Sequence, residues 1–207
     1  MAKKPGRPPP LFRQFVLADL ITIGNASFGM GSIFAAISYV ETKTTLAIKL
    51  AFGLLPLALI CDILDGSVAR WRKRQSPFGS DLDSLSDVIS FGVAPAVMGY
   101  ALGLRGLGDV LVLIYFVACG VSRLARFNAT ADGMMTDKGK VSHFEGTPIP
   151  TTLLVVAILA GCFAFDRVGP EMAGGVLGDK PFQLHPFVLL YFLSGSLMVS
   201  RVRIPKP

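Results

Sequence analysis

Four aspartates lie close together in this sequence and are spaced as two pairs. Asp62 and Asp65 are three positions apart, and Asp83 and Asp87 are four positions apart. Either spacing brings two side chains to one face of a helix. Carboxylates that share a small space repel one another unless cations neutralise them, and their oxygens are the ligands that Mg²⁺ and Mn²⁺ prefer. The pattern therefore predicts a divalent-metal site with room for phosphate oxygens.

Residues suited to phosphate follow the first pair. Gly66 and Ala69 lie on the same helical side as the two aspartates and leave space for a nucleotide to approach the backbone. Arg70 adds a guanidinium, whose planar donors match phosphate oxygens. The alternative is that each aspartate is only a helix-end charge in water. Which reading holds depends on the segments that carry the aspartates.

The segments that must position these residues are strongly apolar. Hydrophobic residues make up 52% of the 207 residues and charged residues 16%, far from the balance of soluble domains. Six apolar stretches approach the roughly 20 residues that cross a bilayer. They lie near residues 17–40, 46–64, 88–104, 109–122, 151–165 and 186–200. We therefore expect an all-α integral membrane protein with six transmembrane helices, in which acids at membrane depth are costly and usually functional.

The basic residues indicate how these helices are oriented. Of the 20 Lys and Arg residues, 15 lie near the two ends of the sequence or in the segments around residues 70 and 130. Because Lys and Arg resist translocation, we expect both termini and the aspartates on the cytoplasmic side of the cell (inner) membrane. Topology and anionic headgroups account for the net charge of +6, so nucleic-acid binding is not expected.

The rest of the chain adds few features. Residues 1–10 are rich in Lys, Arg and Pro and are expected to form a disordered basic tail, with residues 11–207 as a single membrane domain. Residues 11–19 mix apolar and charged side chains, which predicts a short amphipathic segment at the membrane interface. Pro77 and Gly79 are expected to break the helix between the two aspartate pairs. The three cysteines show neither a disulfide nor a metal-binding spacing.

The aspartates and the residues between them fit the pattern D-x2-D-G-x2-A-R-x8-G-x3-D-x3-D, the signature of the CDP-alcohol phosphatidyltransferases. The sequence resembles that family at every fixed position, namely Asp62, Asp65, Gly66, Ala69, Arg70, Gly79, Asp83 and Asp87. The resemblance implies a homodimeric six-helix membrane enzyme whose site opens to the cytoplasmic interface. It also implies that the four aspartates hold two divalent ions, Mg²⁺ or Mn²⁺, around the pyrophosphate of CDP-diacylglycerol, and that Asp87 is the general base.

The same resemblance assigns further residues to the lipid donor. They are Thr22, Asn25, Gly66, Ala69, Arg70, Ser76 and Gly79. In the first apolar stretch, Thr22, Asn25 and Gly29 fall on one helical face, and Asn25 resembles the nucleotide-contacting Asn of the family. The alternative for these three residues is helix capping or packing.

Sequence outside the signature indicates the acceptor alcohol. The strings CGVSRLARFNAT and HFEGTPIPTT, with the early N-x3-G and the later SFGVAPA, resemble bacterial and archaeal phosphatidylserine synthases. L-Serine is therefore the leading acceptor, and glycerol 3-phosphate, inositol phosphate and choline are the alternatives. Arg123 and Arg126 suit an acceptor carboxylate or a phosphate, and Asn128 suits a hydrogen bond to the amino acid. The alternatives are that the arginines only follow the positive-inside pattern and that Asn128 caps a helix.

The predicted reaction is an in-line displacement at phosphorus without a covalent enzyme intermediate, so its kinetics should be sequential. Metal ions would spread the charge on the phosphates, and Asp87 would take the proton of the attacking hydroxyl. An ion transporter is the competing class, since intramembrane acids also line ion pathways. A transporter would spread its carboxylates over several spans, whereas four lie here in one window. His185 is expected to lie on the opposite side of the membrane from the aspartates.

Overall fold

The computed structural model describes residues 17–71, 77–134, 143–169, 172, 174–178, 181–200 and 203–205. The predicted tail at residues 1–10 and most of the predicted amphipathic segment at residues 11–19 lie outside them. The helices are α1 (Leu17–Thr42), α2 (Thr45–Trp71), α3 (Pro77–Asp87), the π-helical segment η2 (Val88–Val93), α4 (Ala94–Leu102), α5 (Leu107–Met134), the 3-10 segment η3 (Ile149–Thr151), α6 (Thr152–Ala164) and α7 (Val188–Val199). Two short strands, β1 (His143–Glu145) and β2 (Arg203–Pro205), complete the described part.

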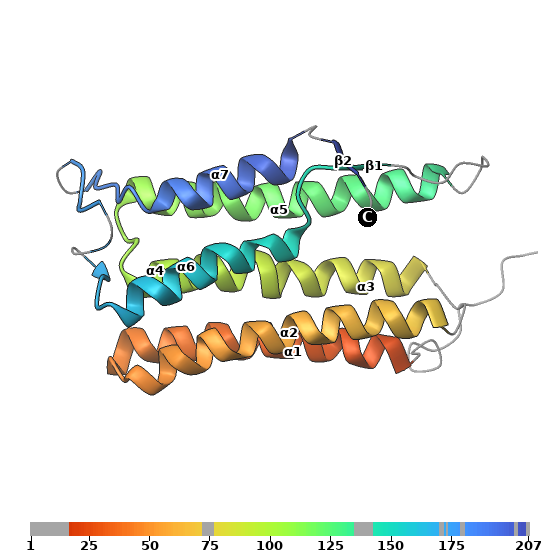
Figure 1. Ribbon diagram of the computed structural model, residues 1–207, viewed down its shortest axis with the longest axis horizontal. Helices are drawn as coiled ribbons and strands as arrows, with labels where there is room; N and C mark the ends of the chain where they lie inside the picture. Colours follow the sequence, from red (N-terminus) through yellow and green to blue (C-terminus); the bar gives the residue numbers. More distant parts are fainter. Residues whose placement is uncertain are drawn as a thin grey trace, which may run out of the picture.

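The helices lie side by side along the long axis of the molecule (Figure 1). α1 and α2 form a hairpin whose tight turn places Lys43 at a positive φ of 55°. α3, η2 and α4 follow one another without a break as a central rod, and α1 packs against all three. α5 and α7 pack together on the other side of this rod (Figure 1). Apolar side chains such as Phe91, Phe116 and Tyr191 fill the core between the helices.

The outer surface of the bundle is apolar, as contact with lipid requires. Large hydrophobic side chains such as Phe34, Leu154 and Leu189 are exposed, which water would disfavour over so many positions. Within the described ranges, four segments are long and apolar enough to cross a bilayer, namely Ala18–Thr42, Thr45–Val68, Phe78–Leu102 and Leu107–Ala129. The all-α integral membrane fold is thus confirmed. α6 and α7 are shorter apolar helices, so the count of six spans stays a prediction.

The third span begins earlier than its apolar pattern indicated. Helix α3 starts at Pro77 and includes Gly79, so the predicted helix break at Gly79 is wrong. Proline is tolerated in the first turn of a helix because the amide hydrogen that it lacks would have no partner there. The polar residues up to Asp87 therefore extend an otherwise apolar rod. As a result, both aspartate pairs are held on helices.

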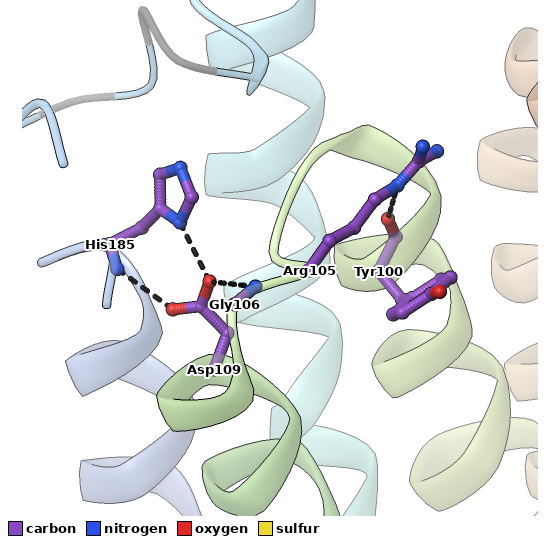
Figure 2. Close-up of polar contacts among 5 residues, drawn as sticks. All are labelled: Tyr100, Arg105, Gly106, Asp109 and His185. Atoms are coloured by element: carbon purple, nitrogen blue, oxygen red, sulfur yellow. Dashed lines mark hydrogen bonds and ion pairs between the residues drawn. The ribbon is translucent and has the colours of Figure 1, made fainter. Parts of the chain in front are cut away.

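A buried pair of Asp109 and His185 closes the end of the bundle opposite the start of α3 (Figures 1 and 2). In the first turn of α5, Asp109 accepts a hydrogen bond from the Gly106 amide at 3.0 Å, as the acid of a capping box does. The same carboxylate accepts the His185 amide at 2.8 Å and pairs with the His185 ring at 2.7 Å. These bonds anchor the connection between α6 and α7 to α5. His185 thus lies away from the aspartates of α2 and α3.

A small sheet at the other end was not predicted. β1 and β2 pair in antiparallel fashion, with Phe144 opposite Ile204, near the end where α3 begins (Figure 1). Strands of three residues are too short to leave a periodic pattern in the sequence. Gly146 follows β1 at a positive φ of 77°, and a side chain there would collide with the Met198 carbonyl. The sheet joins the segment before α6 to the segment after α7.

Candidate active site

Three aspartates from two helices converge beside the central rod. Asp62 of α2 and Asp83 and Asp87 of α3 each offer one carboxylate oxygen, and these oxygens lie within 4.8 Å of one another. Asp87 is buried, and the other two are partly buried. The spacing of four residues keeps the α3 pair on one helical face, and that face is turned to α2. Oxygen atoms gathered at this separation suit a divalent cation.

The cluster has the properties of a cation site rather than of a hydrogen-bonded acid network. Among the residues whose side chains are described, none forms an ion pair with Asp62, Asp65, Asp83 or Asp87. Oδ1 of Asp83 is buried without a hydrogen-bond partner in the same part of the chain, and such an atom is costly unless a ligand completes it. Carboxylate oxygens are the donors that Mg²⁺ and Mn²⁺ take. The residues present therefore fit a divalent metal.

Asp65, the fourth predicted metal residue, has its closest described partner on α1. Its Oδ2 accepts a hydrogen bond from Thr22 Oγ1 at 2.6 Å, and both residues are buried. Asp19, in the first turn of α1, is also buried and lies one turn before Thr22. Asp19 was not predicted as a site residue, although its spacing of three residues from Thr22 places the two on one helical face. The structure therefore places a second, smaller group of polar residues between α1 and α2.

Asn25 connects α1 to the aspartate cluster. Its Nδ2 donates a hydrogen bond to Oδ1 of Asp87 at 3.2 Å, and the Asn25 side chain is fully buried. The Oδ1 atom of Asn25 is buried and has no hydrogen-bond partner within the described part of the chain. One turn later, Gly29 lies against Ser90 of η2. Ser90 was not singled out in the sequence, although it follows Asp87 by three residues on the same rod.

The other residues assigned to the lipid donor are only partly described. Gly66 lies on α2, and Gly79 lies in the first turn of α3. Ser76 falls outside the described residues. The side chains of Ala69 and Arg70 do so as well, although the backbone of both continues α2. The structure thus describes the acidic residues of the signature in full and the residues predicted to bind the donor in part.

The two arginines predicted to bind the acceptor differ in their surroundings. Both lie on α5. Nε of Arg123 is buried and has no hydrogen-bond partner among the described residues. Nη2 of Arg126 donates a hydrogen bond to the Val199 carbonyl at the end of α7, at 3.3 Å. Arg123 therefore retains an unused donor, and Arg126 is tied to a neighbouring helix.

Asn128, the third predicted acceptor residue, ties α5 to α3. Its Nδ2 donates to Oδ1 of Asp81 at 3.2 Å, and its Oδ1 accepts a hydrogen bond from Ser84 at 3.2 Å. Asp81 and Ser84 lie on either side of Asp83 in the sequence. Both ends of the Asn128 amide are thus engaged by the helix that carries two of the clustered aspartates.

A bundle of apolar helices with converging carboxylates is the architecture of an integral membrane enzyme with a metal-type site. The sequence model of the CDP-alcohol phosphatidyltransferase family matches residues 15–192. The chain belongs to this family. The match includes the signature aspartates and the polar residues of α1 and α5.

Similar curated proteins come from a fungus, a bacterium and an archaeon. The CDP-diacylglycerol–serine O-phosphatidyltransferase of Saccharomyces cerevisiae is 39% identical over 201 residues, which cover 95% of this chain and 73% of that protein. The enzyme of the same name from Helicobacter pylori is 36% identical over 201 residues, covering 95% of this chain and 74% of its own length. Archaetidylserine synthase of Methanothermobacter thermautotrophicus is 41% identical over 145 residues, covering 68% of this chain and 56% of its own.

Proposed function

We propose that this membrane enzyme transfers the phosphatidyl group of CDP-diacylglycerol to the hydroxyl of L-serine, giving phosphatidylserine and CMP. The observation that carries the proposal is the convergence of Asp62, Asp83 and Asp87 in a chain of this family. The serine acceptor is supported by the names of two relatives that match 95% of the chain. The phosphatidyl donor follows from the same names.

We assign two divalent ions, Mg²⁺ or Mn²⁺, to Asp62, Asp65, Asp83 and Asp87. Support comes from the carboxylate oxygens of Asp62, Asp83 and Asp87, which lie within 4.8 Å of one another, and from Oδ1 of Asp83, which has no hydrogen-bond partner among the described residues. Bound ions would neutralise the pyrophosphate of the donor and the charge that develops during transfer. Asp65 would join this set through the oxygen that does not accept the Thr22 hydroxyl.

Asp87 is assigned as the general base. Asn25 donates a hydrogen bond to its Oδ1. The other carboxylate oxygen takes the proton of the serine hydroxyl while the hydroxyl oxygen attacks the phosphatidyl phosphorus. A new phosphorus–oxygen bond forms to serine, and the bond from the same phosphorus to the pyrophosphate bridge breaks. CMP leaves with the bridging oxygen. No group of the protein becomes phosphatidylated, so both substrates must be bound together and the kinetics are sequential.

The donor nucleotide is assigned to residues of α1 and of the signature. They are Thr22, Asn25, Gly66, Ala69, Arg70, Ser76 and Gly79. The unpaired Oδ1 of Asn25 supports this assignment because it is an acceptor available to a cytosine or ribose donor. The glycines leave the helix backbone accessible to a bulky ligand.

The acceptor is assigned to Arg123, Arg126 and Asn128. Arg123 is the best supported, because its buried Nε lacks a partner and a guanidinium pairs well with a carboxylate. Arg126 and Asn128 already bond to α7 and α3, so they would orient the acceptor pocket as much as contact the substrate. An acceptor that carries a phosphate would call for additional cations.

The remaining proposals concern location and assembly. The enzyme is assigned to the cell (inner) membrane, with both termini and the site on the cytoplasmic side, and it is expected to work as a homodimer. The orientation is supported by the 15 of 20 basic residues on the predicted cytoplasmic side. The homodimer rests on the family resemblance alone.

The decisive experiment supplies the detergent-purified protein with CDP-diacylglycerol, Mn²⁺ and one acceptor at a time. Serine, glycerol 3-phosphate, inositol phosphate and choline are compared by CMP release and by lipid product. We expect CMP and phosphatidylserine with serine alone, and none after chelation of the metal. Product with another acceptor and none with serine would overturn the acceptor. No metal-dependent CMP release with any acceptor would overturn the reaction class.

A further inference from the structure

The central rod changes from an α-helix to a π-helix directly after Asp87. The π-helical segment η2 runs from Val88 to Val93 directly after it, and π-helical turns within α-helices are often found at functional sites. Ser90 lies in this segment and is fully buried. A helical serine commonly bonds to a carbonyl four residues earlier in its own helix, as Ser86 does with Leu82 at 2.9 Å. Ser90 makes a different bond.

The Ser90 hydroxyl donates a hydrogen bond across to α1. Its acceptor is the backbone carbonyl of Asn25, at 2.9 Å. The approach is possible because α1 has Gly29 one turn after Asn25. A Cβ at Gly29 would lie 2.8 Å from the Ser90 Cα and would also collide with the Ser90 hydroxyl. The absence of a side chain at Gly29 therefore allows Ser90 to reach the carbonyl.

Asn25 is consequently held to the central rod at two points. Its side chain donates to Oδ1 of Asp87 at 3.2 Å, and its carbonyl accepts the Ser90 hydroxyl at 2.9 Å. The two points on the rod are three residues apart, about one helical turn. Two bonds at this separation fix both the rotation and the sliding of α1 against the rod. The position of the Asn25 amide relative to Asp87 is thereby determined.

We infer that Ser90, seated against Gly29, is a positioning residue for the reaction. It holds Asn25 so that the amide of Asn25 fixes Oδ1 of Asp87, and with it the orientation of the whole carboxylate beside Asp62 and Asp83. This inference rests on the proposed role of Asp87. Loss of the Ser90 hydroxyl lets the amide shift, and Asp87 then rotates within the cluster. A displacement of about 1 Å at a reacting group lowers a rate by about 100-fold.

The test compares Ser90→Ala with a matched control, Ser32→Ala. Ser32 is also fully buried, and its hydroxyl also donates to a carbonyl of a neighbouring helix, that of Ala51 on α2, at 2.9 Å. Both substitutions therefore remove the same kind of bond, but only Ser90 is linked to Asp87. Binding of Mn²⁺ to the purified protein without substrates is measured by the loss of the free-ion signal in electron paramagnetic resonance. Values of kcat and KM are measured in parallel.

We expect Ser90→Ala to weaken Mn²⁺ binding and to lower kcat, each by about 10-fold, the lower limit for losing a residue that orients a ligand. KM for serine should stay within about twofold, because the acceptor residues of α5 are untouched. Ser32→Ala should bind Mn²⁺ and turn over like the wild type. If Ser90→Ala matches Ser32→Ala in Mn²⁺ binding and kcat, Ser90 is only a packing residue and the inference fails.

Two further measurements keep the test decisive. Gly29→Ala should weaken Mn²⁺ binding at least as much as Ser90→Ala, and unchanged binding would overturn the role of the close approach. If Ser90→Ala does not survive extraction, the Mn²⁺ concentration that half-saturates CMP release in isolated membranes replaces the binding titration. A wild type that binds Mn²⁺ but releases no CMP with any acceptor would overturn the proposed function. The Mn²⁺ comparison would still decide the role of Ser90.

Discussion

The two ends of this bundle both contain buried aspartates, and the two sets differ in what surrounds them. Asp109 is fully buried and accepts two backbone amides and the ring of His185 (Figure 2). In the cluster of Asp62, Asp83 and Asp87, acids lie near other acids, and Oδ1 of Asp83 has no partner. Burial alone therefore does not distinguish a structural acid from a functional one. The hydrogen-bond partners are more informative, since a fold satisfies most of its buried polar groups, and a group of charged side chains left without partners is a candidate for a ligand.

The same distinction extends to the arginines. Arg105, at the end with Asp109, donates to the carbonyls of Tyr100 and Ala101 at 3.1 and 3.2 Å. Arg123, one of the predicted acceptor residues on α5, has a buried Nε without a hydrogen-bond partner among the described residues. Substituting the bonded residues at the Asp109 end should therefore lower the stability of the protein. Substituting Arg123 or the clustered aspartates should instead lower its activity.

The strongest test of the comparison is Asp83→Asn. Turnover should fall by more than about 100-fold, since even residues that merely orient metal ligands cost 10- to 100-fold when they are replaced. Thermal stability in the absence of metal should be kept or raised, because one of several repelling carboxylates becomes neutral. CMP release and thermal unfolding of the purified variant measure the two effects. Retained turnover would show that the metal-site assignment is mistaken.

Asp109→Ala should give the converse result. It leaves the His185 ring and two backbone amides without their acceptor in a buried site, which should cost about 3–5 kcal/mol of stability. Thermal unfolding is the measurement, with Mn²⁺ affinity as the second readout. Affinity within about twofold of wild type is expected, because the site lies at the other end of the bundle. A variant as stable as wild type would contradict the role given to this pair.

Divalent ions should stabilise the protein through the acidic cluster. At a free Mn²⁺ concentration of about 100 times its Kd, linkage predicts about 2.7 kcal/mol of added stability. The unfolding temperature of the wild type should therefore rise with Mn²⁺ and fall again with chelator. Asp83→Asn should respond much less, whereas Ser32→Ala should respond fully. An equal response of all three proteins would place the ion elsewhere.

The smallest expected effect concerns the acceptor. Arg123→Gln should raise KM for serine by about 10- to 100-fold, as expected for loss of a charged hydrogen bond of about 1.5–3 kcal/mol. KM for CDP-diacylglycerol should change little. The control is Arg105→Gln, which removes a bonded arginine at the far end and should leave both KM values unchanged. Equal behaviour of the two variants would remove Arg123 from the acceptor site.

Much of the fold follows from the sequence because burial in lipid leaves a strong signal. Long apolar runs located the helices, and the integral membrane class is confirmed. The start of α3 at Pro77 was less visible, because the first turns of that helix are rich in polar residues and lack the apolar pattern of the other spans. η2 packs against both α1 and α5. No local residue pattern in the sequence indicated its π-helical form.

The site was predictable to the extent that it depends on helical spacing. The pairing of Asp83 with Asp87 followed from their separation, and the approach of Asp62 followed from the expectation that the two pairs share one metal site. Contacts between distant segments were not predictable in detail. The bond from Thr22 to Asp65 and the links of Asn128 to α3 depend on how helices are rotated about their axes. That rotation is set by the packing of many side chains at once.

The π-helical turn also limits how this gene can change. Within η2 the chain is spaced so that the Ala94 amide bonds to the Ile89 carbonyl, five residues earlier, and the rod thus contains one residue more than an α-helix of the same turns. Deleting one residue there would leave an α-helix with the same number of turns, so the acids of α3 would keep their face toward α2, but the residues around Ser90 would lose their register against Asn25. Deleting one residue from the α-helical part of the rod would instead rotate α3 against α4 by about 100° and turn the acids away from α2. Substitutions should therefore be tolerated in the rod more readily than single-residue deletions.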